Sequence, residues 1–267
     1  MGHKRYGYLP KSQIWRNIVD GLAGYSLGQA EVLSIAQSTL RNVQSQYTNL
    51  KNDPSINAAF EFLVHVSLAF QKNDPIKYLT EKKILDKEEL SLIRLAKGAT
   101  KYKSDEVASH EYQTFARQAA IDAVNNWYKQ NIERGQTFFS EGIDNEAVFR
   151  KASNGSGFCE LSRLYFSKLT ERYLKYFLER EASIKISNVS EREKFSKEIE
   201  TQVDHISKHA FETAKITESF SAGWFNKNVK GDFPDESEVK YFLNRSFGKT
   251  KSELFRQEGG QVREEAK

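Results

Sequence analysis

The chain has 267 residues, of which 39% are hydrophobic, 28% are charged and 12% are aromatic. This length and aromatic content exclude an intrinsically disordered chain and suffice to bury a substantial core. The net charge of +4 is a modest excess that permits contact with nucleic acid without requiring it.

Several classes of protein are disfavoured by what the sequence lacks. Cys159 is the single cysteine, which excludes an internal disulfide and a multi-cysteine zinc or iron–sulfur site. Since it lies in a predicted helix beside Phe158, we expect it to pack as a small apolar side chain. No apolar run approaches the roughly 20 residues that cross a bilayer, and no secretory signal is recognisable. We therefore expect a cytoplasmic protein without membrane contact or cofactor.

Residues 1–11 lack helical periodicity and combine basic and aromatic side chains. We expect an extended arm in which Lys4, Arg5 and Lys11 contact phosphates while Tyr6 or Tyr8 stacks on a base or packs on a partner. The equally weighted alternative is a flexible terminus that its aromatic residues hold to its own domain.

Residues 12–135 predict a succession of helices, because apolar residues recur at spacings of three and four. Two starts pair a capping aspartate with a proline at the first helical position, at Asp53-Pro54 and Asp74-Pro75. Gly24, Gly98 and Gly135 are expected to end helices. The expected starts are Ser12, Ser26, Pro54, Pro75, Asp86 and Ser104, and the last of these helices should run through Trp127.

The most basic stretch lies between two of these helices and contains no acid; its cations are Arg94, Lys97, Lys101 and Lys103. One interpretation is a loop that gathers phosphates without reading sequence. The other is a set of solvated cations that complement the end of a helix, which is the more common role of such charge runs.

Residues 136–157 predict a domain boundary. Asp144 should cap a short helix around Val148 and Phe149, and a run of Asn, Gly, Ser and Gly follows at 154–157. Backbone N–H groups of such glycines can bind an anion, but no preceding strand or Gly-Lys-Ser/Thr pattern accompanies them. We therefore do not expect an anion site at this run and interpret it as part of the domain boundary.

Residues 158–248 predict a long helical hairpin followed by a final helix. The first arm should end at Ala182, and Ser190 with Glu193 fits a capping box for the second. Residues 184–189 form either a connector between the arms or a short strand, and we favour the connector. The apolar stripe of the first arm comprises Leu161, Leu164, Tyr165, Leu169, Tyr173, Tyr176 and Phe177. That of the second comprises Phe195, Ile199, Val203, Ile206, Ala210, Ala214 and Phe220.

The second arm is expected to stop at Gly223, which leaves open whether Trp224 and Phe225 face a core or an interface. The final helix should start at Asp235 and end near Gly248. Residues 249–267 should form a flexible tail.

Two pairs of side chains have spacings that suit chemistry. His205 and His209 lie four apart on a predicted helix and can share a divalent metal, with Glu212 or a remote carboxylate as a third ligand. Glu61 and His65 are spaced so that the carboxylate can orient the imidazole. Because apolar residues surround His65 in the sequence, we expect a hydrogen-bonded core histidine instead.

The sequence as a whole predicts an all-α multi-helix bundle of roughly eight to ten helices with a long C-terminal helical hairpin. Our leading hypothesis is a non-catalytic adaptor or accessory subunit that docks another protein and approaches DNA or RNA. A bacterial defence or nucleic-acid-processing assembly would employ such a subunit. The alternatives are a metal-dependent hydrolase that uses His205 and His209, and a structural homo-oligomer.

Overall fold

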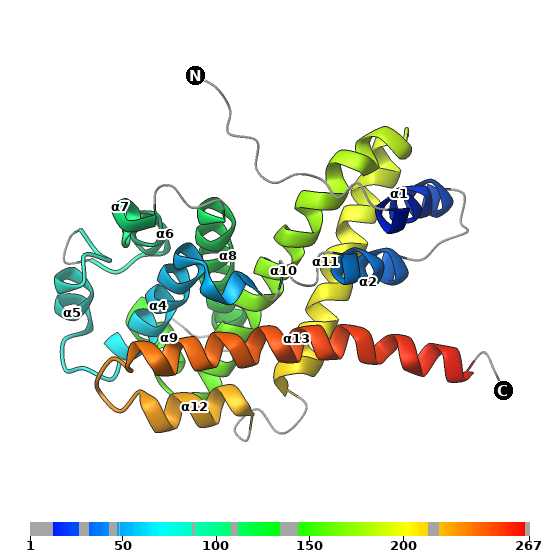
Figure 1. The fold of residues 1–267 in the computed structure, drawn as a ribbon. Coiled ribbons are helices and arrows are strands. Elements are labelled where there is room, and N and C mark those ends of the chain that lie inside the picture. The colour runs from blue at the N-terminus through cyan, green and yellow to red at the C-terminus, as the bar shows by residue number, and fades with distance from the viewer. Residues whose placement is uncertain are drawn as a thin grey trace.

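The structure is a computed structural model that describes residues 13–26, 32–42, 47, 49–86, 89–107, 112–133, 144–212 and 219–264. Every regular element within these ranges is a helix, which confirms the predicted all-α class (Figure 1). None of the described helices is both long enough and apolar enough to cross a membrane. The arm at residues 1–11 lies outside the described residues, so its role stays a prediction.

The elements up to residue 133 are mostly short helices. They are α1 (Gln13–Ser26), α2 (Val32–Asn42), η1 (Leu50–Asn52), α4 (Pro54–Ala69), α5 (Pro75–Glu81), α6 (Leu92–Lys101), α7 (Ser104–Val107) and α8 (Gln113–Glu133). The elements after residue 144 include the three longest helices. They are α9 (Asn145–Arg150), η2 (Lys151–Ser153), α10 (Gly155–Lys185), α11 (Val189–Glu212), α12 (Phe220–Asn228) and α13 (Glu236–Glu264).

Three of the predicted capping aspartates occupy the positions that the sequence indicates. The Asp53 carboxylate accepts hydrogen bonds from the backbone N–H of Ser55 at 2.8 Å and of Ile56 at 3.3 Å. Asp74 caps α5 by accepting from the backbone N–H of Lys77 at 2.9 Å. Asp144 caps α9 by accepting from the backbone N–H of Ala147 at 3.2 Å. Each cap satisfies a helical donor that has no partner within its own helix.

The prediction of a helix that starts at Asp86 and ends at Gly98 is wrong. Helix α6 begins at Leu92, capped by the Ser91 hydroxyl, and continues through Gly98 to Lys101. A Cβ atom at Gly98 would lie 2.1 Å from the Ile84 carbonyl oxygen, so glycine permits close helix packing there and does not end the helix. The basic stretch is therefore mainly helical. The single long helix expected from Ser104 is divided into α7 and α8, with residue 112 in a turn.

Three expected helix boundaries in the C-terminal half are also wrong. Asn188, not Ser190, caps α11, because its side-chain oxygen accepts from the N–H of Ser190 at 2.8 Å and of Glu191 at 3.4 Å. Gly223 lies inside α12, and Gly248 lies inside α13, which continues to Glu264. A glycine in a helix costs only about 1 kcal/mol, which packing of its neighbours can offset. The expected connector, by contrast, is confirmed at residues 186–188.

Helix α10 is the central element and packs against α8, α11 and α12. Figure 1 shows α4 to α9 gathered at one end, α1 and α2 beside α11 at the other, and α13 running along both groups. The buried apolar side chains of both groups form one continuous cluster. Most of the predicted stripe of the first arm belongs to it, namely Leu161, Leu164, Tyr165, Leu169 and Tyr173.

Cys159 lies within this core and is fully buried. Its Sγ atom accepts a hydrogen bond from the Ser219 hydroxyl at 3.0 Å. The expected packing role of the single cysteine is therefore confirmed.

Candidate functional site

The basic stretch on α6 is partly neutralised by acids that precede it or lie elsewhere in the chain. The Arg94 guanidinium contacts Asp86 at 3.1 Å and Glu89 at 2.9 Å. The Lys103 ammonium lies 2.7 Å from a carboxylate oxygen of Glu61. Only two cations of the predicted patch, Lys97 and Lys101, are exposed without an ion pair to a described residue.

His65 occupies the buried environment that the sequence predicts. Its side chain is 4% exposed, its Nδ1 atom lies 2.7 Å from the Tyr78 hydroxyl, and its ring stacks on Phe233 at 4.1 Å. Burial, with the nearby charges of Lys82 and Lys103, lowers the pKa of His65 to about 3. Its hydrogen-bonded core role is confirmed.

Glu61 does not orient His65, because its carboxylate contacts Lys103 and accepts from the Tyr102 hydroxyl at 3.5 Å. Burial and the charge of Asp232 raise the pKa of Tyr78 to about 12. Neither His65 nor Tyr78 therefore changes protonation near neutral pH, which argues against general acid–base work by this pair.

His205 and His209 lie on α11 with their ring centroids 4.6 Å apart. The adjacent Asp204 is engaged elsewhere, at 2.8 Å from Arg163 and 3.2 Å from Lys208. Among the described side chains no three His, Cys, Asp or Glu residues converge as a metal site. The side chain of Glu212 lies outside the described residues, so the histidine pair stays a hypothesis.

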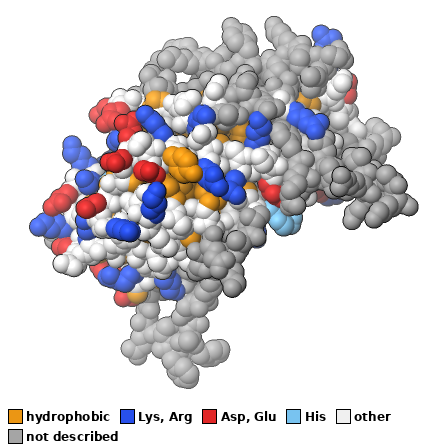
Figure 2. Space-filling view, turned by 60° about the horizontal axis from the view of Figure 1, so that its bottom comes forward, with side chains coloured by type: hydrophobic (Ala, Val, Ile, Leu, Met, Phe, Trp, Pro, Cys, Tyr) orange, Lys and Arg blue, Asp and Glu red, His pale blue; other side chains and the backbone are white. Residues whose placement is uncertain are grey.

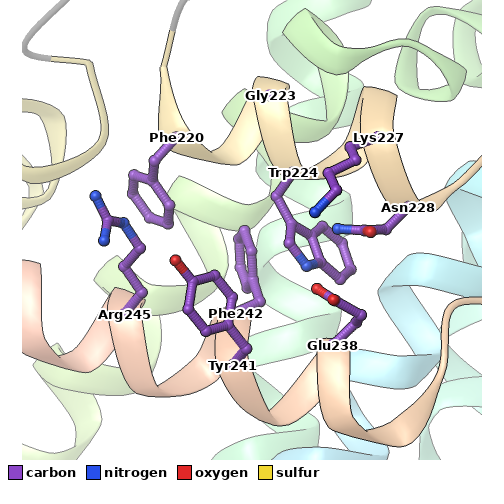
Figure 3. Close-up of a pocket in the computed structure, with 9 residues that line it drawn as sticks. All are labelled: Phe220, Gly223, Trp224, Lys227, Asn228, Glu238, Tyr241, Phe242 and Arg245. Carbon is purple, nitrogen blue, oxygen red and sulfur yellow. The ribbon is translucent and has the colours of Figure 1, made fainter.

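A pocket that the sequence did not predict lies between α12 and α13. Its volume is about 280 Å³ (Figure 3). Residues spaced by three and four on each helix line it, because such residues share one helical face. Helix α12 contributes Phe220, Gly223, Trp224, Lys227 and Asn228, and α13 contributes Glu238, Tyr241, Phe242 and Arg245.

The aromatic residues of the pocket differ in exposure. Phe242 is 1% and Trp224 is 6% exposed, and their ring centroids lie 4.6 Å apart, so they belong to the core and form the base of the pocket. Tyr241 is 54% exposed and presents a free ring at its edge. Phe225 is buried on the other side of α12, stacked on Phe158 at 4.5 Å.

Cations border the pocket without acidic partners among the described residues. Lys227 and Arg245 line it, and Lys249 follows one turn further along α13. The Arg245 guanidinium lies 6.0 Å from the centre of the Phe220 ring and the Lys249 ammonium 5.3 Å from it. Figure 3 shows Phe220, Tyr241 and Arg245 together at one end, and Lys227, Asn228 and Glu238 at the other.

Figure 2 looks toward the side of the molecule that carries α12 and α13. An exposed hydrophobic patch lies near the middle of this face, with blue Lys and Arg side chains on several sides of it. Acidic side chains also border the patch on one side, and they are interspersed with further cations toward that end of the view.

Sequence reasoning missed the pocket because it placed a helix end at Gly223. With α12 broken there, Phe220 and Lys227 did not fall on one face. The signal was present in the spacing of residues 220, 224 and 227 and of residues 238, 241 and 245. Only the packing of α12 against α13 shows that the two faces meet.

Comparison with known proteins gives no relative: no family model, no curated protein and no solved structure matches the chain. Function is therefore inferred from the residues of the molecule itself.

Proposed function

We propose that the protein is a non-catalytic helical accessory subunit that binds nucleic acid through the face formed by α12 and α13. The observation that carries this proposal is the set of Lys227, Arg245 and Lys249 around an aromatic pocket, without an acidic partner among the described residues. Lysine and arginine side chains that are not neutralised by neighbouring acids are the groups that hold phosphates.

A cationic side chain without an acidic partner gains more free energy from binding a polyanion than one that already forms an ion pair. Arg94 would have to exchange its contacts with Asp86 and Glu89 for contacts with phosphates, and much of the gain would cancel. Lys227, Arg245 and Lys249 have no such contact with any residue that the structure describes. Neutralising phosphates also releases counterions from the nucleic acid, which makes the binding sensitive to salt.

The role of an accessory subunit rests on a second feature. We interpret α10 and α11 as the predicted helical hairpin, whose turn joins Ile184 and Val189 across a short connector. Ile184 is 68% and Val189 is 59% exposed, so two large apolar side chains face solvent at its tip. Apolar side chains exposed together favour docking of a protein partner, because their burial is gained only in a complex.

The nucleic-acid proposal is tested by fluorescence anisotropy with a labelled single strand of mixed sequence at about 50 to 200 mM salt. Changing Lys227, Arg245 and Lys249 together to glutamate should lower the affinity at least tenfold. Three lost phosphate contacts should also flatten the slope of log K against log salt by about 2.

Matched charge reversals show which surface is responsible. Glutamate at the exposed Lys129, Lys185 and Lys197 changes the net charge equally on other faces and should have much less effect. Glutamate at Lys97 and Lys101 tests the patch that the sequence predicted, and glutamate at Lys4, Arg5 and Lys11 tests the arm. If the α12–α13 variant binds like the wild type, the proposed surface is wrong.

The metal-dependent hydrolase remains an alternative, supported by the close approach of His205 and His209 on one face of α11. Elemental analysis of protein purified without an affinity tag decides it. One metal per chain that is lost on His209→Ala would establish a site there, and substoichiometric metal unchanged by that substitution would remove the hypothesis.

A structural homo-oligomer is the other alternative and is tested by sedimentation velocity across protein concentrations. A stable oligomer that binds no nucleic acid at low salt would favour it over the accessory subunit. A monomer would instead leave the tip at Ile184 and Val189 for a different protein partner.

A further inference from the structure

We infer that the α12–α13 pocket receives one unpaired nucleobase of a single strand, while Lys227, Arg245 and Lys249 hold the adjoining phosphates. This inference rests on the proposed nucleic-acid binding and specifies its ligand. The pocket combines an exposed aromatic face, polar groups in its wall and, at its edge, cations that form no ion pair within the described part of the chain. Those are the three contacts that a nucleotide in a single strand offers to a protein.

The size of the pocket matches a single base. At about 280 Å³ it lies just below the usual range for small-molecule sites, which starts at about 300 Å³. A duplex presents its bases edge-on inside its grooves, so no base face is available to the Tyr241 ring. An unpaired base is flat and can leave its neighbours to stack on a protein ring.

Space for the base is left by Gly223. A Cβ atom added at this position would meet no atom within 4 Å, so the wall of α12 is open there. Tyr241 stands on the facing helix with its ring 54% exposed. A base that enters between these two residues covers the Tyr241 face and approaches Trp224 and Phe242 at the base of the pocket.

The two ends of the pocket fix the orientation of the nucleotide. Arg245 and Lys249 lie at the end near Phe220 and offer positive charge to phosphate. Asn228 and Glu238 lie at the other end and offer hydrogen-bonding groups to the edge of the base (Figure 3). Lys227 reaches over this second end and suits a phosphate on the other side of the same nucleotide.

Glu238 points to guanine as the preferred base. Its carboxylate lines the pocket and makes no ion pair with a described residue, so its two oxygens are available as acceptors. Guanine offers two parallel N–H donors on its Watson–Crick edge, which match the two oxygens of a carboxylate, whereas thymine offers one. The acidic side chains of a peptide offer this carboxylate no donor, which is why we favour a nucleotide over an acidic peptide for this basic, aromatic site.

The experiment compares the full-length protein with three probes of equal length. They are a labelled strand of abasic sugar–phosphate units that carries one central guanine, the same strand without any base, and a duplex of mixed sequence. We expect the guanine strand to bind at least tenfold more tightly than the abasic strand, because stacking on an aromatic ring is lost without the base. The duplex should bind no more tightly than the abasic strand.

Two glycine substitutions distinguish loss of the pocket from a change in helix stability. Gly223→Leu places a side chain in the opening and should reduce binding of the guanine strand to the abasic level. Gly248→Leu is the matched control, because Gly248 also lies inside a helix with no atom within 4 Å of an added Cβ but does not line the pocket. Tyr241→Ala should likewise remove the advantage of the base. Glu238→Gln should remove only the preference for guanine over thymine, measured with a strand that carries a thymine in place of the central guanine.

The outcomes distinguish this inference from the proposed function. If none of the probes binds, the proposed function fails and the inference fails with it. If all three bind equally and the Lys227, Arg245 and Lys249 charge reversal weakens each of them, the surface binds phosphates and the base pocket is wrong. Equal competition by a polyglutamate peptide would also overturn the inference, since it would show that charge alone is recognised.

Discussion

Phe60 on α4 stacks on Phe242 on α13, with ring centroids 4.8 Å apart and ring planes 14° from parallel. Phe60 is fully buried and also packs against Phe158 and Trp224. Two residues that form the base of the α12–α13 pocket are therefore held by a helix from the N-terminal half. The pocket is part of the common core and not a feature of the C-terminal helices alone.

Replacing Phe60 should destabilise the whole protein. Phe60→Ala removes a buried ring and leaves a cavity, which should lower the free energy of unfolding by about 3 to 5 kcal/mol. Urea denaturation followed by circular dichroism measures the change. Ile93→Ala, at a side chain that is 72% exposed, is the control and should change it by less than about 0.5 kcal/mol. Equal stability of the two variants would contradict the packing of Phe60.

His65 should make the fold sensitive to acid. Its pKa is about 3 in the fold against 6.5 in a free side chain, so between these values the unfolded chain binds the extra proton. Stability should therefore fall as pH decreases through this window, by at most about 1.4 kcal/mol per pH unit. Above pH 6.5 the group is neutral in both states and contributes no pH dependence.

His65→Gln retains a polar group near the Tyr78 hydroxyl but does not titrate. It should be less stable than the wild type at neutral pH, and the difference should shrink as pH falls from 6.5. Chemical denaturation of both proteins across this range measures the difference. The facing groups Glu61, Lys82 and Lys103 are common to both proteins, so their own titration cancels. A constant difference would show that His65 protonates normally in the fold.

Asp204 should stabilise the contact between α10 and α11. Burial alone would raise its pKa, but the charges of Arg163 and Lys208 and their hydrogen bonds lower it overall. Its stabilising contribution is present above the ordinary aspartate pKa and is lost as pH falls through the lowered value. Arg163 is 6% exposed, so Asp204→Asn removes a negative charge that faces a buried cation and should cost about 2 kcal/mol at neutral pH.

The matched control for Asp204→Asn is Lys208→Gln. The Lys208 side chain is 54% exposed, and its contact with Asp204 is screened by solvent. This substitution should cost less than about 1 kcal/mol. Thermal unfolding of the two variants at pH 7 compares them, and a larger loss for Lys208→Gln would show that Arg163 is not the main partner.

Gly157 and Gly248 should respond in opposite ways to alanine. A Cβ atom at Gly157 would lie 1.9 Å from the Lys151 carbonyl oxygen, so Gly157→Ala must displace backbone and should cost about 2 kcal/mol or more. Gly248→Ala meets no atom and should stabilise α13 by about 0.5 to 1 kcal/mol. Melting temperatures of the two variants provide the measurement, and a neutral Gly157→Ala would contradict the close approach of η2 to α10.

The sequence by itself determined the features that depend on neighbouring residues. Apolar spacing predicted the all-α class, and an aspartate before the first helical turn predicted the starts of α4, α5 and α9. Such signals are local, because a cap binds an N–H group two or three residues further along the chain. The buried role of His65 was predictable for the same reason, from the apolar residues around it in α4.

Only the tertiary structure decided the features that depend on residues far apart in the chain. Gly98 packs on Ile84 while Gly223 faces open space, yet both appeared in the sequence as helix ends. A glycine in a helical pattern can end the helix, permit close packing or leave space beside the helix. Which of these applies depends on the atoms that face the position of the absent Cβ, and the spacing of apolar residues does not predict them. Likewise, Lys103 is neutralised by Glu61 from α4, whereas Lys227, Arg245 and Lys249 have no described acidic partner. The number of cations along the chain favoured residues 94–103 as the basic surface. The packing of α12 against α13 instead gathers cations that have no ion pair with a described residue.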